Sequence, residues 1–307
     1  MISKSAIEDA HARIAPYIRR TPVMESNGDF CDHDTPLSLK LELFQHTGSF
    51  KPRGAFNNLL TRPVPQAGIA AASGGNHGAA VAYAAARLGH KAKIFVPEIS
   101  SQAKQAKIRE AGAELVVEGA LYADALALCN AYQQQTGAMT VHAYDSEETI
   151  AGPGTLALEW LQQSGPLDTL LVAAGGGGLI AGILLACQDV CRVISVEPEG
   201  SCCLAQALQA GRPINVDVDS IAADSLGAQS LGKLSFEICQ KHLHRAITVP
   251  DSAILKTQKA IWQKLQIITE PGGATALSAL VHGAYIPEPG ERIGVLLCGA
   301  NAESGVF

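Results

Sequence analysis

The sequence contains few aromatic residues, no block of basic residues and no cysteine pair of the CxxC type. Aromatic side chains make up 5% of the 307 residues, and the 23 Lys and Arg residues are spread along a chain that also has 29 Asp and Glu. Without a basic block, no nucleic-acid partner is expected. No apolar run reaches the length of a membrane span without glycine or charge, so no membrane partner is expected either. Residues 1–20 alternate charged and apolar side chains, unlike a signal peptide.

The cysteines are scattered and do not suggest a metal site. None has a histidine at zinc-finger spacing. We therefore expect no metal ion, and free thiols in a reducing cytoplasm. Seven of the eight are interpreted as ordinary packed thiols, and Cys298 is treated separately. The eight are Cys31, Cys129, Cys187, Cys191, Cys202, Cys203, Cys239 and Cys298.

Short apolar segments alternate with Ala-rich helical patterns along the whole chain, which is 47% hydrophobic. This alternation predicts an α/β fold with two parallel or mostly parallel sheets and helices on both faces. Such sheets bind ligands at the carboxyl ends of their strands. The expected strands are 37–42, 69–73, 93–96, 114–117, 140–144, 169–173, 192–196, 244–249 and 292–297. The clearest expected helices are 78–88, 101–111, 122–135 and 252–266.

A lysine stands at the predicted start of a helix in the segment Gly48-Ser49-Phe50-Lys51-Pro52-Arg53. Proline suits a first helical turn. The helix N-terminus carries partial positive charge, which would lower the pKa of the Lys51 amine, as a Schiff-base lysine needs. Taken alone, Lys51 is better explained as a solvated surface side chain.

Two glycine-bearing turns join predicted strands to predicted helices. Residues 72–78 read A-S-G-G-N-H-G. Binding of a carboxylate or phosphate explains this segment about as well as a plain strand-to-helix turn capped by Asn76 does. Residues 174–179 read A-G-G-G-G-L, and four successive glycines favour close wrapping around an anion. The spacing matches neither GxGxxG nor a P-loop, so a dinucleotide oxidoreductase is only weakly supported. After the last predicted strand, C-G-A-N at 298–301 taken alone favours a packed Cys298.

Together, these segments resemble the fold-type II pyridoxal-5'-phosphate (PLP) enzymes, the tryptophan synthase β-like group, and within it the serine/threonine dehydratases and serine racemase. The resemblance runs from about residue 14 to 301, and its eight motifs occur in the family's order. The motifs are T-G-S-F-K-P-R-G-A at 47–55, S-G-G-N-H-G at 73–78, I-A-G-P-G-T at 150–155, G-G-G-G-L-I-A-G at 175–182, V-E-P-E at 196–199, A-A-D-S-L-G at 222–227, E-P-G-G-A at 270–274 and C-G-A-N at 298–301.

The resemblance implies a role for each segment. Lys51 would hold PLP as a Schiff base, Phe50 would pack beside the ring, and Asn76 would bond its phenolic oxygen. Cys298 would face the pyridine nitrogen, and Glu270 would lie near the cofactor. The phosphate would be held by Gly175, Gly176, Gly177, Gly178 and Leu179, and the substrate carboxylate by Ser73, Gly74, Asn76 and His77. A large PLP-binding domain would comprise 1–41 and 141–307, a smaller mobile domain would comprise 42–140, and the chain would form a homodimer.

The implied reaction is a dehydration. Lys51 would remove the Cα proton of L-threonine, L-serine or a related 3-hydroxy amino acid, water would leave, and a 2-oxo acid and ammonia would result. The second hypothesis, serine racemase, is weakened because Gly74 replaces the serine that serves the opposite face of Cα. The racemase cation site is also incomplete, with Cys203 at its second acidic position after Glu197. Pro153 replaces the usual glutamine. A β-replacement enzyme and a non-catalytic binding protein are further alternatives.

Overall fold

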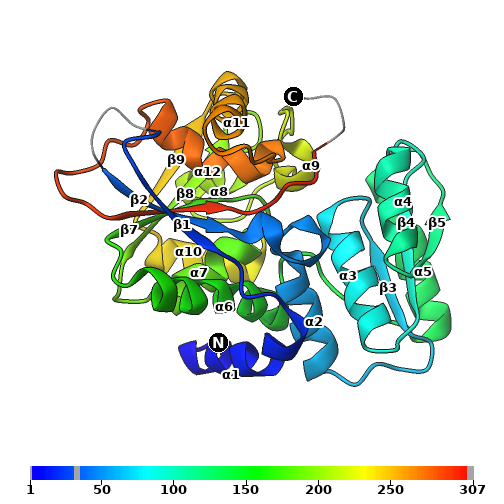
Figure 1. Ribbon diagram of the computed structural model, residues 1–307. Helices are drawn as coiled ribbons and strands as arrows, with labels where there is room; N and C mark the ends of the chain where they lie inside the picture. The colour runs from blue at the N-terminus through cyan, green and yellow to red at the C-terminus, as the bar shows by residue number, and fades with distance from the viewer. Residues whose placement is uncertain (1, 31–34, 303–307) are drawn as a thin grey trace.

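The computed structural model describes residues 2–30 and 35–302, so Cys31 lies outside the described residues. The described residues form two β-sheets of unequal size, each covered by helices (Figure 1). The larger sheet contains six strands in the order β1-β2-β10-β7-β8-β9. Its strands are β1 (Val23–Asn27), β2 (Pro36–Leu41), β7 (Thr169–Ala173), β8 (Arg192–Pro198), β9 (Arg245–Val249) and β10 (Ile293–Leu297).

All neighbouring strands of this sheet run parallel except β1 and β2. The central strands β7 and β10 are buried along their whole length, as expected for a parallel sheet covered on both faces. In Figure 1, α1 (Lys4–Ile14), α6 (Glu147–Ser164), α7 (Gly178–Ala186) and α10 (Lys233–His242) lie on one face, and α11 (Asp251–Leu265) and α12 (Pro271–Val281) lie on the other. The shorter helices are α8 (Cys203–Ala210) and α9 (Ala223–Leu226).

The smaller sheet is wholly parallel and has the order β5-β4-β3-β6. Its strands are β3 (Ile69–Ala72), β4 (Ala92–Val96), β5 (Glu114–Val117) and β6 (Met139–Thr140), and its helices are α3 (Asn76–Arg87), α4 (Gln102–Glu110) and α5 (Tyr122–Thr136). Alternate residues point to opposite faces. Ile94 and Val96 therefore join one apolar cluster with α3 and α4, whereas Phe95 packs with Ala125 and Cys129 of α5.

Helix α2 (Lys51–Thr61) lies between the two sheets (Figure 1) and packs against α6 of the larger unit and α3 of the smaller one. Three short 3-10 helices, η1 (Ala15–Tyr17), η2 (Glu42–Phe44) and η3 (His46–Gly48), complete the elements found in 2–30 and 35–302. The strands of the smaller sheet lie within residues 69–140. The domain boundaries at 41 and 141 and the mobility of residues 42–140 stay predictions. Among the residues described, no helix is both long and apolar enough to cross a bilayer.

The predicted α/β class with parallel sheets is confirmed, and two details of the strand prediction were wrong. The edge strand β1 was missed because its sequence, V-M-E-S-N, is half polar and does not resemble a buried parallel strand. The strand expected over 140–144 ends at Thr140. Beyond that point the backbone carbonyls accept hydrogen bonds from side chains, since Val141 O bonds the ring of His77 and Ala143 O bonds Lys51.

Candidate active site

The Lys51 segment lies beside the segment that follows β10, although the two are far apart in the sequence. Ser49 and Gly299 form an isolated antiparallel bridge. On either side of it, the N–H of Phe50 donates to Cys298 O at 3.1 Å, and that of Ala300 donates to Gly48 O at 2.9 Å. Backbone pairing therefore fixes the start of α2 at the carboxyl end of β10, which is where a parallel sheet places its ligand.

Lys51 is the first residue of α2, with Pro52 in the first turn. Its Nζ donates to the carbonyl oxygen of Ala143 at 2.8 Å and lies 5.1 Å from the centre of the Phe50 ring. Burial lowers the pKa of Lys51 to about 8, while the neighbouring Cys298 and Glu270 act in the opposite direction. Burial is therefore the largest cause of this lowering, whereas the sequence predicted the helix N-terminus as the cause. Near neutral pH, a useful fraction of the amine is uncharged and nucleophilic.

The glycine loop follows β7 and leads into α7, with Gly177 as the N-cap at a φ of 93°. A Cβ on Gly176 would lie 2.4 Å from the Tyr144 ring, and one on Gly178 would lie 2.6 Å from Tyr144 O. Only glycine therefore fits at these positions. The first backbone N–H groups of a helix have no carbonyl within the helix to bond, so they can donate to an anion. This close-fitting loop is suited to a phosphate, as the predicted role of Gly175, Gly176, Gly177, Gly178 and Leu179 requires.

The second loop follows β3 and places Asn76 at the start of α3. The Nδ2 of Asn76 donates to Glu270 Oε1 at 2.8 Å. Glu270 is the N-cap residue of α12, and its backbone N–H donates to Gly299 O at 3.2 Å. Burial raises the pKa of Glu270 to about 7. Three predicted site segments, at 76, 270 and 298–301, thus meet through direct hydrogen bonds.

The side chain of His77 does not offer a positive charge to a carboxylate, because it is neutral and bonded to a backbone carbonyl. Its Nε2 lies 2.9 Å from Val141 O, so this nitrogen carries the proton and donates. Burial, followed by the nearby charge of Lys51, lowers the pKa of His77 to about 3, which keeps the ring neutral. What His77 can offer a carboxylate is its backbone N–H in the first turn of α3.

The other two predicted substrate contacts lie on the same turn. The Oγ of Ser73 accepts a bond from the N–H of Gly75 at 3.3 Å, so its own hydroxyl proton remains a donor. A Cβ on Gly74 would lie 2.6 Å from Ser100 Oγ, so a neighbouring loop fills the space of the absent side chain. Substrate contacts by these residues stay a prediction.

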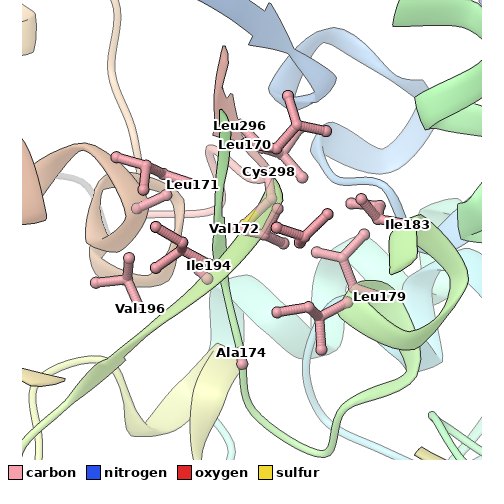
Figure 2. Close-up of a cluster of buried hydrophobic side chains, with 14 of the residues drawn as sticks. Leu170, Leu171, Val172, Ala174, Leu179, Ile183, Ile194, Val196, Leu296 and Cys298 are labelled. Atoms are coloured by element: carbon pink, nitrogen blue, oxygen red, sulfur yellow. The ribbon is translucent and has the colours of Figure 1, made fainter. Parts of the chain in front are cut away.

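Cys298 follows β10 and is buried in the apolar layer formed by β7, β8 and α7 (Figure 2). Its thiol donates weakly to Gly272 O at 3.5 Å, and burial raises its pKa above the ordinary thiol value. The residue therefore presents a neutral thiol at the strand end. The remaining described cysteines are free, in agreement with the sequence prediction.

The cation site of the resembling racemases has no matching ligand set here. Both carboxylate oxygens of Glu197 accept backbone N–H bonds, from Leu204 at 2.9 Å and Ala205 at 2.8 Å. The thiol of Cys203 donates to Gly175 O at 3.2 Å. Within 2–30 and 35–302, no group of three or more His, Cys, Asp or Glu side chains could hold a metal ion. The expectation of no metal stays a prediction.

Three residues at the site were not assigned a role from the sequence. Tyr144 covers the glycine loop, and Ala143 supplies the carbonyl that holds Lys51. Asn301 bonds Asn76 and belongs to the C-G-A-N motif, so its position in a motif was the only available signal. For Tyr144 and Ala143 no signal was available, because their partners lie in distant segments.

The fold and these meeting loops define a PLP enzyme of fold type II. The family model "Pyridoxal-phosphate dependent enzyme" matches residues 14–299, and the chain belongs to this family. It is 38% identical to a phenylserine dehydratase of Ralstonia pickettii, over 99% of this chain and 94% of the relative. Maize serine racemase superposes with a TM-score of 0.93 at 34% identity, covering 99% and 94% of the two chains. A threonine deaminase from T.th. gives a TM-score of 0.91 at 35% identity, covering 98% and 99%.

Proposed function

We propose that this chain is a PLP-dependent dehydratase that eliminates water from L-threonine, L-serine or a related 3-hydroxy amino acid, and so yields a 2-oxo acid and ammonia. The observation that carries the proposal is the amine of Lys51. It is enclosed, its pKa is lowered to about 8, and it lies where the loops that follow β3, β6, β7 and β10 meet. The similarity to a phenylserine dehydratase and a threonine deaminase supports the same reaction type.

The residues present would hold each part of the cofactor. Lys51 would bind its aldehyde carbon, the backbone N–H groups of 175–179 its phosphate, and Asn76 its phenolic oxygen. Phe50 would pack against the ring, Cys298 would face the pyridine nitrogen, and Glu270 would lie close by. When bound, PLP withdraws electrons from the attached amino acid and makes the Cα–H acidic.

Lys51 is the group that moves the proton. Once its Nζ is free and uncharged, it can remove the proton from Cα, and the hydrogen bond to Ala143 O would orient that amine. The same nitrogen could then return a proton to the departing hydroxyl, so that water leaves. The substrate carboxylate would bind the turn formed by Ser73, Gly74, Asn76 and His77, through the Ser73 hydroxyl and the backbone N–H groups at the start of α3.

The neutral thiol of Cys298 favours elimination. A carboxylate at this position would keep a facing ring nitrogen protonated. Burial raises the pKa of the Cys298 thiol, so the thiol stays neutral and would not keep that nitrogen protonated. Negative charge at Cα is then less well delocalised, and loss of a β-leaving group removes that charge quickly. A neutral thiol at this position therefore favours dehydration over reactions that need a long-lived carbanion.

Serine racemase is the second candidate, because the maize enzyme has the same fold at 34% identity. Racemisation needs a proton donor on the face of Cα opposite Lys51. Gly74 has no side chain to supply one. We therefore rank the racemase second.

The test combines a substrate panel with chiral analysis. Purified holoenzyme should release 2-oxo acid from one or more of L-threonine, L-serine and a 3-phenyl-substituted serine, and Lys51→Ala should release none. Incubation with L-serine should leave no D-serine. Accumulation of D-serine without 2-oxo acid would contradict the dehydratase. A requirement for an added nucleophile would point to β-replacement.

We also propose a cell compartment and an oligomeric state for the enzyme. The free thiols of the described residues suit a reducing cytoplasm, and the family resemblance implies a homodimer. Light scattering of the purified holoenzyme would give twice the chain mass, and a monomeric mass would contradict the dimer.

A further inference from the structure

The side-chain amide of Asn76 belongs to a chain of hydrogen bonds that runs in one direction. Lys107 Nζ donates to Asn301 Oδ1, and Asn301 Nδ2 donates to both Asn76 Oδ1 and Thr47 O. Asn76 Nδ2 then donates to Glu270 Oε1 at 2.8 Å. The bond from Asn301 to Thr47 measures 2.9 Å.

The two ends of this chain fix its direction. The ammonium of Lys107 can only donate, and the backbone carbonyl of Thr47 can only accept, so the amide of Asn301 has one possible orientation. That orientation presents an N–H to Asn76, whose Oδ1 must therefore face Asn301. Rotation of the Asn76 amide by 180° would place its N–H groups against the N–H of Asn301. It would also place its oxygen against the carboxylate oxygen of Glu270.

The backbone conformation of Thr47 and Gly48, just before Lys51, lets Asn301 lie close to Thr47 O. Thr47 has a φ of 60°, in the left-handed region, and Gly48 follows at 73°. A Cβ on Gly48 would lie 2.6 Å from Asn301 Oδ1. The T-G of the Lys51 motif thus makes room for Asn301 and turns a carbonyl toward it.

We propose that Asn301 is a positioning residue which, with Lys107 and Glu270, sets the Asn76 amide so that its remaining N–H points to the phenolic oxygen of the cofactor. The inference rests on the proposed function, which places that oxygen beside Asn76. The Asn76 Nδ2 carries two hydrogens, one bonded to Glu270, so one is left for the cofactor. The reversed amide would instead direct an oxygen at an electron-rich oxygen.

The chain of hydrogen bonds also joins the two sheets. Lys107 lies on α4 of the smaller unit, whereas Asn301 follows β10 of the larger one. These residues line one small cavity together with Gly74, Gly75, Lys104 and Glu270. The orientation of a cofactor contact therefore depends on a bond that forms only while α4 lies against the larger unit.

Two substitutions of Asn301 separate orientation from packing. Asn301→Asp keeps the shape but places an oxygen opposite both Thr47 O and Asn76 Oδ1, which forces Asn76 to reverse. Asn301→Ala removes the contact and leaves Asn76 bonded to Glu270. A packing role predicts the larger effect for alanine, whereas a role in orientation predicts the larger effect for aspartate.

The measurement is the dissociation constant of PLP for cofactor-free protein, followed by absorbance, with the pH dependence of the bound chromophore. We expect Asn301→Asp to weaken binding at least about tenfold more than Asn301→Ala, the size expected when a charge-assisted hydrogen bond turns repulsive. Circular dichroism and thermal unfolding of each cofactor-free variant confirm that it is folded.

A pair of basic residues on one helix provides a second, independent route. Lys107→Glu places an acceptor against Asn301 Oδ1 and should weaken PLP binding and shift the chromophore's pH midpoint. Arg109→Glu, also on α4, breaks a 3.3 Å bond to Gln105 of the same helix and makes the same charge change. It should leave both quantities close to native. Equal effects of the two charge reversals on α4, or a larger effect of Asn301→Ala than of Asn301→Asp, would overturn this inference and leave the proposed function standing. Failure of the native protein to bind PLP would overturn the proposed function with it.

Discussion

The Nζ of Lys51 lies 2.8 Å from the carbonyl oxygen of Ala143, 92 positions further along the chain. The next residue, Tyr144, covers the glycine loop, where a Cβ on Gly176 would meet its ring at 2.4 Å. One short loop after β6 therefore orients the amine and also closes one side of the proposed phosphate cradle. The reactive carbon and the phosphate of one cofactor would be positioned by adjacent residues.

Capture of PLP should depend on pH through Lys51. The attacking form is the neutral amine, and burial lowers the pKa of Lys51 to about 8. The rate of chromophore formation on mixing should therefore rise about tenfold per pH unit below 8 and level off above it. A stopped-flow series from pH 6 to 10 checks this. A rate that keeps rising to pH 10 would mean that the lysine behaves as a solvated one.

The lowered pKa of Lys51 also has a consequence for stability. Between about pH 8 and the higher pKa of the unfolded chain, the unfolded state binds more protons than the folded state. The free energy of unfolding contributed by this group therefore rises with pH across that window. In cofactor-free protein, where the amine is free, Lys51→Met should remove this contribution, and denaturant titrations at pH 8 and pH 10 would reveal a smaller rise in stability with pH than in the native sequence.

Gly176→Ala should abolish tight PLP binding, because the added Cβ would force the Tyr144 ring out of contact with the loop. We expect the dissociation constant to rise about tenfold or more, consistent with overpacking of about 1–3 kcal/mol. Gly211→Ala is the control. It sits at a φ of 68° with no neighbour within 4 Å of the new Cβ, so it strains the backbone without touching the site. Equal losses in the two variants would argue against the cradle.

Arg53 should be essential for folding stability although it does not face the site. It is fully buried and donates to both oxygens of Glu42, at 2.7 and 2.8 Å, and to Glu159 at 3.0 Å. Glu159 would keep its pair with Lys40 at 2.5 Å, but Arg53→Met would leave the buried Glu42 carboxylate without its cationic partner, so we expect the free energy of unfolding to fall by about 3–5 kcal/mol. Lys93→Met, which breaks the exposed pair with Glu114, should change it by less than about 1 kcal/mol. Urea titration measures both, and similar losses would contradict this account.

Divalent cations should not affect this protein. The carboxylate of Glu197 already accepts two backbone N–H groups, and Cys203 bonds the glycine loop directly through Gly175 O. Treatment with a chelator should leave PLP affinity and the unfolding temperature unchanged. Cys203→Asp would restore a second carboxylate and should make the unfolding temperature respond to Mg²⁺ or Ca²⁺. A response of the native protein would contradict the prediction.

Much of the fold could be predicted because its signals are local. Strands such as β7 and β10 are continuous apolar segments, and the turns after β3 and β7 carry glycines that mark strand-to-helix junctions. The site was harder to predict because its contacts are not local. Asn301 meets Asn76 across 225 positions, and no periodicity encodes such a contact. The edge strand β1 was missed since its partly exposed, polar sequence gives no apolar run.

The chemical environment of Lys51 illustrates the same limit. Sequence placed it at a helix start, which is correct, and predicted a lowered pKa. The main cause of that lowering, burial, arises only when the loops from both sheets enclose the amine. Local pattern thus identified the residue, whereas its electrostatics required the tertiary structure.

The most direct test is to fix the cofactor chemically and find where it is attached. Native protein loaded with PLP should absorb at roughly 410–420 nm, as a conjugated Schiff base does. Reduction with borohydride followed by peptide mass spectrometry should then locate the reduced cofactor on Lys51, and Lys51→Ala should remain unlabelled. Labelling of a different lysine, or of none, would contradict the central claim.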